Sequence, residues 1–532
     1  MGLSPPTRSL STFGWSLAGA VLLAASFAPV GVYPVAWVAL VPILSRWARR
    51  DATWAYAREL YAVFLTTSCL AGFWLLFHPV TSQAVQGGVG LFLVPIPLVA
   101  SFLGAAYARQ RWGLSAGLAL LAANVVATEY LLLHSPLHAP WLLLGHTQAV
   151  AVPFIQMADV GGVLLLSAWV MALNVTVFLA LPVAPSLPKT WSGRLALLRS
   201  DRPGLRSLAV ATVALLVALP LAYSTARLDA IDGIRSYLRV GIVQPNITPR
   251  DWSDPAAKDR VAYLADLSNS AVKSWRGGLD SLGSVRPVSL RRAGSAGEPV
   301  GLLIWPQGAL PHLGSQDRQR ALLDRLDRWS ERMNVGLLAG AEVLEDDAGR
   351  PVQASVFLNP KAPPQVSDRT IHSPLFDGVS GTGAGGRVKP FVFGHTQIAS
   401  VVGFESLFGE HVQDVTAGAD LLVALTKTDQ WGHSPGIYQH LAFTRLRAVE
   451  TRRSVIVSSV RGVSAVIRPD GSAERVAGWK DQGVVSLDVP MVRETTVYAS
   501  WGDWVGLLGL GLAVVGNAAA LGVRRKPRVP ER

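Results

Sequence analysis

The sequence predicts an α-helical polytopic membrane bundle joined to an α/β domain outside the membrane. Half of the 532 residues are hydrophobic, only 16% are charged and the mean hydropathy is +0.33, values that are typical of a membrane protein. The apolar residues concentrate before residue 225 and near 503–522, whereas the rest resembles an ordinary globular sequence. We therefore predict a transmembrane bundle at 1–225, an extramembrane domain at 226–500, and a transmembrane helix with a basic tail at 501–532.

Several apolar stretches have about the length that a membrane span needs. They lie at 13–29, 32–45, 60–77, 88–107, 113–133, 160–182, 207–224 and 503–523. The second is the weakest candidate because it is short and interrupted by prolines. Alternatively, the first is a cleaved signal peptide, with Arg8 before it and small residues near Ala24. Cleavage there would break the alternation of charge along the loops.

Basic residues distinguish the two sides of the membrane. Lysines and arginines follow the second, fourth, sixth and last apolar stretches, whereas the loops after the first, third and fifth contain none. Because cytoplasmic loops are enriched in Lys and Arg, residues 226–500 are predicted to lie across the membrane from the cytoplasm. In a bacterium with two membranes, this location is the periplasmic side of the inner membrane.

Short apolar, β-branched runs alternate with helical patterns in the extramembrane domain. Strands are predicted at 238–243, 302–305, 335–341, 398–403, 421–425 and 454–459, and helices at 257–275, 317–333 and 439–450. This alternation predicts an α/β core whose helices cover the sheet faces. Two stretches are predicted as loops, 277–300 and 378–387. The second lacks the Lys-Ser or Lys-Thr and the following helix of a phosphate-binding loop, so a lid or a linker is expected there.

Several functional classes are not indicated. The net charge of +12 comes largely from residues in short loops rather than along one face, so nucleic-acid binding is not expected. The single cysteine, Cys69, allows no disulfide and no cysteine-based zinc site within the chain. His134 and His138 have i, i+4 spacing, but Pro136 lies between them and the sequence places no third ligand near. We expect neither a metal nor a cofactor.

Polar residues inside apolar stretches are costly and often have a role. Glu129 and Asn174 fall inside predicted spans, where we expect them to form interhelical hydrogen bonds. In the last predicted helix of the α/β domain, Arg445, Arg447 and Glu450 are expected to be buried as charge pairs.

Recognisable motifs are spread over nearly the whole chain. They are VLLAASFAPVGVYPVAWVALVPIL at 21–44, ATEYLLLHSPLHAPWLLLGHTQ at 127–148, VQPNI at 243–247, WPQGALP at 305–311, GFESLFGEHVQD at 403–414, the run from DQWGHS to RLRAVE at 429–450, and TVYASWGDW at 496–504. Together these motifs resemble the apolipoprotein N-acyltransferase family. The resemblance implies a nitrilase-like αββα sandwich for the extramembrane domain.

The resemblance also implies a two-step acyl transfer. A cysteine thiolate takes an acyl chain from a phospholipid to form a thioester, and the chain then passes to the free amino group of a diacylglyceryl-cysteine at a lipoprotein N-terminus. This chemistry needs a nucleophile, a carboxylate base and a cation that stabilises the oxyanion. The implied partners are phospholipid, the lipoprotein N-terminus and the membrane, and an intact acyltransferase relative is a further candidate.

All three catalytic positions depart from the family pattern of Glu, Lys and Cys. The base motif Trp-Pro-Glu ends here in Gln307, and the nucleophile motif Cys-Tyr-Glu begins with Gly403. The lysine motif aligns best with 369–377, which places Arg369 at the lysine position. A neutral amide cannot accept the proton and glycine offers nothing to acylate, although arginine can still stabilise an oxyanion. Losing a nucleophile lowers turnover on the order of a millionfold, so we expect a silent or impaired relative that keeps a role in binding lipid or lipoprotein.

Other site positions match the family. Glu405 corresponds to the carboxylate beside the family's cysteine, and it either supports the site or serves as a structural ion-pair partner. The candidate substrate-binding residues are Trp252, Asp377, Phe404 and Trp431. The two tryptophans either contact acyl chains or pack in the core or at the membrane boundary.

Two alternatives stay open. One is an active N-acyltransferase with a displaced nucleophile, either Ser406, three residues after Gly403, or Ser400 on the same strand. Such a serine needs a base, for which His395 and His411 are candidates. The other alternative is a membrane-anchored nitrilase-like amidase, which the many spans disfavour because a soluble amide substrate needs no access from the lipid phase.

Overall fold

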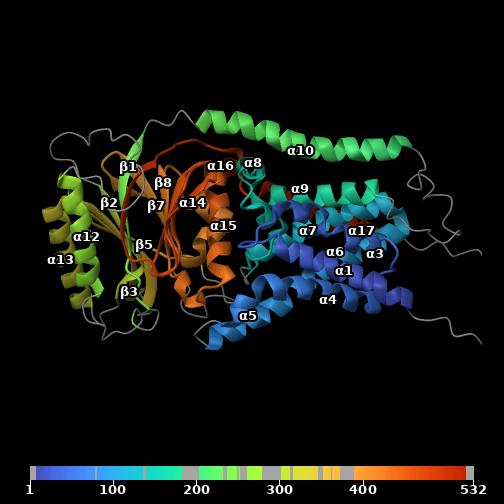
Figure 1. The fold of residues 1–532 in the computed structure, drawn as a ribbon, viewed down its shortest axis with the longest axis horizontal. Helices are drawn as coiled ribbons and strands as arrows, with labels where there is room; N and C mark the ends of the chain where they lie inside the picture. The colour runs from blue at the N-terminus through green and yellow to red at the C-terminus, as the bar shows by residue number, and fades with distance from the viewer. Residues whose placement is uncertain are drawn as a thin grey trace, which may run out of the picture.

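The computed structural model shows an elongated molecule. A helical bundle forms one end and a sheet-rich domain the other, and the long helix α10 (Pro203–Ile231) runs along one side (Figure 1). The structure describes residues 7–77, 81–135, 139–181, 203–231, 236–248, 251, 260–277, 301–311, 316–345, 351–360, 362–371 and 389–522.

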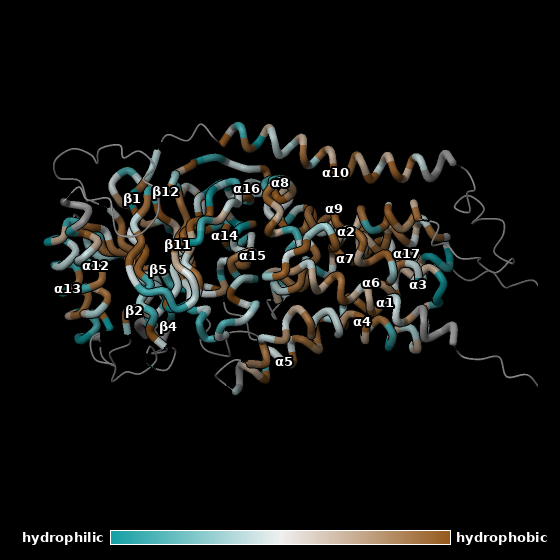
Figure 2. The backbone as a smooth tube through the Cα atoms, in the orientation of Figure 1, coloured by the Kyte–Doolittle hydropathy of each residue, from teal (hydrophilic) through white to brown (hydrophobic). Residues whose placement is uncertain are grey.

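The bundle consists of apolar helices. Besides α10, its longer helices are α1 (Thr7–Ala25), α4 (Trp54–Gly72), α5 (Thr81–Leu93), α6 (Pro95–Trp112), α7 (Leu114–His134), α9 (Ala158–Ala180) and α17 (Trp504–Gly522). Among the described residues, six helical stretches are long and apolar enough to cross a membrane: Trp54–Phe77, Ala84–Trp112, Leu114–His134, Ala158–Ala180, Ser207–Asp229 and Trp504–Gly522. Phe13–Ala25 is apolar but shorter. Hydrophobic residues dominate these helices (Figure 2).

The second predicted span, 32–45, is divided into short helices. Its pieces are η1 (Tyr33–Val35), α2 (Ala36–Ala39) and α3 (Val41–Trp47). Pro34 and Pro42 stand in the first turns of η1 and α3, where the missing proline N–H is tolerated. Asn174 of α9 compensates for the interruption, because its side chain accepts from the N–H of Leu40 at 2.8 Å and donates to the carbonyl of Ala36 at 2.7 Å. The interhelical role predicted for Asn174 is confirmed.

Glu129 fastens an irregular segment to the bundle. Its Oε1 accepts from the backbone N–H of Leu144 at 2.6 Å, at the start of η3 (Leu144–Gln148). The next N–H, of Gly145, donates to the hydroxyl of Ser167 in α9 at 2.8 Å. Glu129 and Ser167 thus bind backbone groups that no regular helix satisfies, as expected for buried polar residues in a bundle.

The extramembrane domain contains two six-stranded sheets. The first has the order β12-β1-β2-β3-β4-β5 and the second the order β11-β10-β9-β8-β7-β6. In both, three consecutive strands are parallel (β1, β2, β3 and β9, β8, β7) and the outer pairings are antiparallel. The strands are β1 (Tyr237–Gln244), β2 (Leu302–Leu310), β3 (Gly336–Glu345), β4 (Pro351–Asn359), β5 (Ala362–Asp368), β6 (Phe391–Phe393), β7 (Thr396–Val402), β8 (Leu421–Thr426), β9 (Ser454–Ser459), β10 (Ser464–Ile467), β11 (Ala473–Ala477) and β12 (Gly483–Pro490).

The sheets pack face to face between two helical layers. Phe357 and Phe391 stack in the core between them, with centroids 5.4 Å apart. Helices α12 (Arg260–Gly277) and α13 (Gln316–Met333) cover the first sheet, and α14 (Gly409–Val415) and α15 (Pro435–Thr451) cover the second. This αββα sandwich confirms the predicted fold class.

The six predicted strands and three predicted helices of this domain are present, with ends that differ by a few residues. Strands β4, β5, β6, β10, β11 and β12 were not predicted. Apart from Gly277, which ends α12, the predicted loops at 277–300 and 378–387 lie outside the described residues.

Helix α15 joins the sandwich to the bundle. Most of its residues are buried, because one side faces the second sheet and the other faces the membrane helices. Ala448 packs in the cluster beneath the sheet, whereas Phe443, Leu446 and Val449 belong to the same apolar cluster as the bundle. The two parts of the molecule therefore share one continuous core.

An aromatic cluster lies at this junction. Trp74 and Trp141 come from the bundle side, and Phe404, Trp431 and Phe443 come from the domain. The ring centroids of Trp74 are 5.0 Å from Trp141 and 4.8 Å from Trp431. Trp141 lies 5.3 Å from Phe443, and Phe404 stacks on Trp431 at 5.3 Å. Burial of such large rings contributes strongly to docking of the domain.

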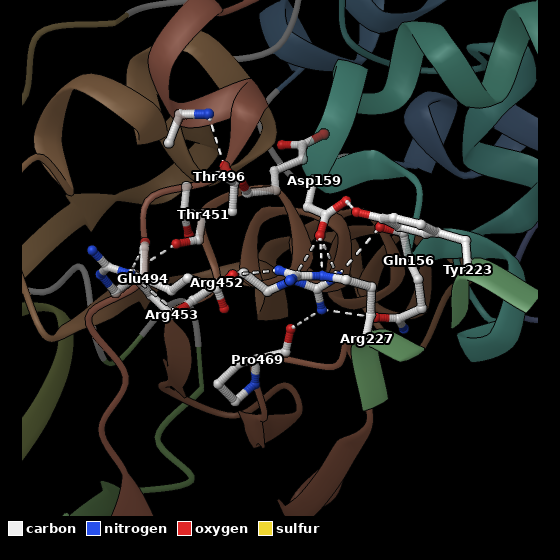
Figure 3. A network of polar contacts seen from close by, with 12 residues as sticks. Gln156, Asp159, Tyr223, Arg227, Thr451, Arg452, Arg453, Pro469, Glu494 and Thr496 are labelled. Carbon is white, nitrogen blue, oxygen red and sulfur yellow. Dashed lines mark hydrogen bonds and ion pairs between the residues drawn. The ribbon is translucent and has the colours of Figure 1, made fainter. Parts of the chain in front are cut away.

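A buried polar network reinforces the junction at the other end of α15 (Figure 3). Asp159, in the first turn of α9, accepts from Arg452 at 2.7 Å, from Arg227 at 2.9 Å and from the hydroxyl of Tyr223 at 2.7 Å. Arg452 also donates to the side-chain oxygen of Gln156 at 2.7 Å. Since Asp159 and Arg452 are both buried, their charges depend on each other for compensation.

A second buried pair caps a kink in α9. Helical geometry breaks at Gly161 and Gly162, just before the backbone N–H of Val163. The Oε1 of Glu450 accepts from this N–H at 3.0 Å and from the guanidinium of Arg447 at 2.8 Å. The buried pairing predicted for Arg447 and Glu450 is confirmed, and it reaches into the bundle.

Replacing Arg452 with Gln is expected to destabilise the protein by about 3 kcal/mol, because Gln156 and Asp159 stay buried and Asp159 keeps only Arg227 of its two guanidinium partners. The matched control is Arg493→Gln. The Arg493 side chain is 54% exposed and binds Asp420 at 2.9 Å, so its loss should lower the melting temperature much less. Melting temperatures of the purified variants in the same detergent give the comparison. Equal shifts in the two variants would contradict the role assigned to the buried network.

Candidate functional site

The three residues predicted at the triad positions meet at one point between the two sheets. Gln307 lies in β2, Arg369 directly follows β5, and Gly403 directly follows β7. A Cβ atom built on Gly403 would lie 3.5 Å from Oε1 of Gln307 and 3.6 Å from both Cζ and Nη1 of Arg369. The structure thus brings together all three residues that the sequence selected.

Gln353 of β4 holds two of these residues. Its Oε1 accepts from Nε2 of Gln307 at 3.0 Å and from Nη1 of Arg369 at 2.8 Å. The backbone N–H of Arg369 also donates to the Gln353 carbonyl at 2.8 Å, and its Nε donates to the carbonyl of Ile371 at 3.0 Å. The amide of Gln307 therefore serves as a hydrogen-bond donor to a neighbouring side chain, in a position where the resemblance implies a carboxylate.

Gly403 makes the turn from β7 into η5 (Gly403–Leu407) with φ +65°. A side chain in this left-handed conformation costs about 1–2 kcal/mol. Nothing comes closer to the built Cβ than ordinary van der Waals contact, so the position has space for a small side chain. Steric crowding therefore does not explain why position 403 carries no side chain.

Glu405 is an ionised anchor in this turn. Its buried carboxylate accepts from the backbone N–H groups of Val402 at 2.8 Å, Thr370 at 2.7 Å and Ile371 at 3.1 Å, and lies 3.4 Å from Nε2 of His411. Burial acts to raise its pKa, but His411, the charge of Arg369 and the Val402 N–H together lower it to about 2. Glu405 therefore ties the turn that begins at Gly403 to the segment that follows Arg369.

Ser406 has a histidine neighbour that the sequence did not predict. Its Oγ lies 3.3 Å from Nε2 of His440 in α15, and that nitrogen lies 3.4 Å from the carbonyl oxygen of Gly403. Burial lowers the pKa of His440 to about 4 despite this carbonyl contact, so the imidazole is neutral at neutral pH. The two candidate bases lie elsewhere, because His411 contacts Glu405 and His395 is exposed beyond the other end of β7.

The other serine candidate is a core residue. The hydroxyls of Ser400 and Ser355 lie 2.6 Å apart between β7 and β4, and both residues are buried.

Phe404 and Trp431 are buried in the aromatic cluster at the junction, so in this structure they pack against bundle residues. Trp252 and Asp377 lie outside the described residues.

Asp429 is a further buried carboxylate near the site. It lies in η6 (Thr428–Trp431), just after β8, and neither carboxylate oxygen has a hydrogen-bond partner in another described residue. Burial raises its pKa to about 6, although the charges of Lys427 and Arg461 oppose that shift. Asp429 is the first residue of the family-like run DQWGHS, so the motif could have identified it as a candidate site residue.

Comparisons with known proteins point to one family over most of the chain. The family model of the apolipoprotein N-acyltransferase N-terminal domain matches residues 19–176, and the carbon-nitrogen hydrolase family model matches residues 239–497. Apolipoprotein N-acyltransferases of Chlorobaculum tepidum and Geobacter metallireducens are 24% and 26% identical to this chain. These alignments cover 91% and 95% of this chain and 91% and 94% of the two relatives. A solved amidase from Nesterenkonia sp. is 17% identical, with a TM-score of 0.35 over 48% of this chain and 92% of the amidase.

The αββα sandwich and the matching family model define the α/β part as a domain of the carbon-nitrogen hydrolase class, carried here by a membrane bundle. With the bundle matched as well, the chain belongs to the apolipoprotein N-acyltransferase family. It is a membrane protein of that family in which Gly403, Gln307 and Arg369 occupy the meeting point.

Acidification should destabilise the protein through His440. Its folded-state pKa of about 4 lies below the ordinary histidine value of 6.5, so the unfolded chain binds more protons between these values. The stability that comes from burying the neutral ring is present above pH 6.5 and is lost as the pH falls toward 4, by about 3 kcal/mol in total.

His440→Gln should therefore flatten the dependence of melting temperature on pH across this window, and His395→Gln, at an exposed histidine, should leave it unchanged. An unchanged profile in the first variant would show that His440 does not titrate as described.

Proposed function

We propose that this chain is a catalytically silent member of the apolipoprotein N-acyltransferase family that binds phospholipid or a lipoprotein N-terminus without transferring an acyl chain. It would lie in a bacterial inner membrane with the α/β domain on the periplasmic side, as the distribution of Lys and Arg in the loops indicates. The observation that carries the proposal is the position of Gly403, whose missing side chain would project between Gln307 and Arg369.

This site lacks the nucleophile with which the family reaction begins. Thioester formation requires a thiolate that attacks the ester carbonyl of a phospholipid and expels a lysophospholipid. Gly403 has no atom that can form the new bond. Gln307 cannot take the proton from a thiol or an amine, and its N–H group is already donated to Gln353. Arg369 retains a positive charge that could stabilise an oxyanion, but no step that forms one is available.

The residues around the reacting point support a retained binding role. Glu405 still fixes the turn and the Arg369 segment through three backbone hydrogen bonds. The aromatic cluster still joins the domain to the membrane helices, where a lipid substrate would arrive. The substitutions at the triad positions therefore affect the groups that would react, whereas the residues that surround the site keep their contacts.

The wild-type protein is expected to form no acyl adduct when it is incubated with radiolabelled phospholipid. The triple variant Gly403→Cys, Gln307→Glu, Arg369→Lys restores the three reacting groups, and we expect it to form a thioester that neutral hydroxylamine releases. Intact-protein mass spectrometry measures both results.

The control is the same triple variant with Ala in place of Cys at position 403, which has the same backbone strain and no thiol. A labelled wild-type protein would contradict the proposal.

The binding half of the proposal is tested separately. A fluorescent diacylated lipopeptide in detergent micelles should bind saturably to the wild type and to the triple variant, with affinities within about threefold, because no wall of the site has changed. Binding that does not saturate, or that a monoacylated peptide reproduces equally, would contradict a retained lipoprotein-binding role.

A second candidate function is acyl transfer through Ser406. The observation in its favour is the 3.3 Å separation between its hydroxyl and the neutral imidazole of His440. Two observations disfavour this function. Both side chains are buried, and the hydroxyl of Thr444 also donates to the Ser406 hydroxyl at 3.4 Å. If this function holds, labelled phospholipid will yield an ester adduct on Ser406 that Ser406→Ala abolishes and Ser400→Ala retains.

A further inference from the structure

Three side chains that commonly bind metals meet at the junction of bundle and domain, away from the degenerate triad. His134 is the last residue of α7, Glu410 lies in α14, and Asp503 directly precedes α17. Nε2 of His134 is 2.6 Å from Oε2 of Glu410 and 3.6 Å from Oδ2 of Asp503. One ligand atom from each residue lies within 4.8 Å of the others.

Further contacts orient two of these groups. Nδ1 of His134 is 2.9 Å from the carbonyl oxygen of Tyr130, and the two rings are stacked with centroids 4.1 Å apart. The hydroxyl of Tyr498 donates to the other oxygen of Asp503, Oδ1, at 2.9 Å. Metal-bound histidines usually donate their second ring nitrogen to a backbone carbonyl, and metal-bound carboxylates are usually hydrogen-bonded in turn. The arrangement around His134 and Asp503 follows that pattern.

The charges also favour a cation. When Nδ1 of His134 donates to the Tyr130 carbonyl in the neutral ring, the lone pair of Nε2 faces two carboxylates. These three acceptors repel one another unless a proton or a metal ion lies between them. The nearby Arg447 donates to Glu450 at 2.8 Å and to the carbonyl of Leu407 at 3.2 Å.

We propose that His134, Glu410 and Asp503 form a binding site for a divalent transition-metal ion, of which Zn²⁺ fits best. One imidazole and two carboxylates suit zinc, with water in the fourth position, whereas Ca²⁺ and Mg²⁺ prefer oxygen ligands alone. Tetrahedral ligands at zinc distances lie about 3.3 Å apart. The observed separations of 2.6 and 3.6 Å lie on either side of this value, and the Glu410 side chain is 52% exposed and free to adjust.

A metal here would act as a structural link. It would connect α7 of the bundle, α14 of the sandwich and the start of α17, three elements that are distant in sequence. Its position is independent of the triad, so the site does not depend on whether the protein transfers acyl chains. Binding to the folded protein alone should raise its melting temperature.

The test uses tag-free, chelator-treated full-length protein in detergent. Titration with Co²⁺ is expected to give visible absorption that saturates at one equivalent and that Zn²⁺ displaces. Asp503→Asn and Glu410→Gln should each weaken Co²⁺ binding at least tenfold and remove the rise in melting temperature that Zn²⁺ produces. Because Glu410 is half-exposed, its variant tests the site even if Asp503→Asn folds poorly.

The matched control is Glu474→Gln, at an exposed carboxylate in β11, which should bind like the wild type. The proposal is overturned if the wild type takes up no Co²⁺ at micromolar concentrations, since the cluster is then an imidazolium bridging two carboxylates. It is equally overturned if Glu410→Gln binds Co²⁺ as tightly as the wild type and the Glu474 variant do.

Discussion

The buried contact between Asp159 and Arg452 fixes the position of the sandwich on the bundle. Asp159 stands where α9 begins and Arg452 where α15 ends, so their 2.7 Å contact joins the membrane part directly to the domain. An arginine buried at this depth needs several hydrogen-bond partners, and Gln156 and the carbonyl of Pro469 supply the others, while Arg227 is a second partner of Asp159. The aromatic cluster around Trp74 holds the opposite end of α15 by apolar contact instead.

The candidate site depends on this docking because α15 also contacts the turn that carries it. His440 of α15 approaches both Ser406 and the carbonyl of Gly403, while Glu405 binds the segment after Arg369. The turn is therefore held from the bundle side and from the first sheet at once. Under the proposed function, the fold is retained and only the reacting groups at the site differ from those the family reaction needs.

Much of this could be predicted from the sequence, and the reasons for the rest are physical. The central parallel strands are continuous apolar runs, whereas β5 contains two prolines and β11 is mostly exposed, so neither has the pattern of a buried strand. The sequence motifs around them identified Gln307 and Gly403 as candidate site residues. Gln353, which holds the first of these, lies on an unpredicted strand, and the contact of His440 with Ser406 arises only when α15 packs on the second sheet.

The central claim is tested most directly by measuring whether the triacylated lipopeptide is formed. Purified chain, reconstituted in phospholipid vesicles with a diacylated lipoprotein, should leave the N-terminal lipopeptide at its diacylated mass, as measured by mass spectrometry over hours. An active relative in parallel vesicles should add one acyl chain in the same period. If the chain itself produced the triacylated mass with repeated turnover, the account of Gly403 as a silenced nucleophile position would be contradicted.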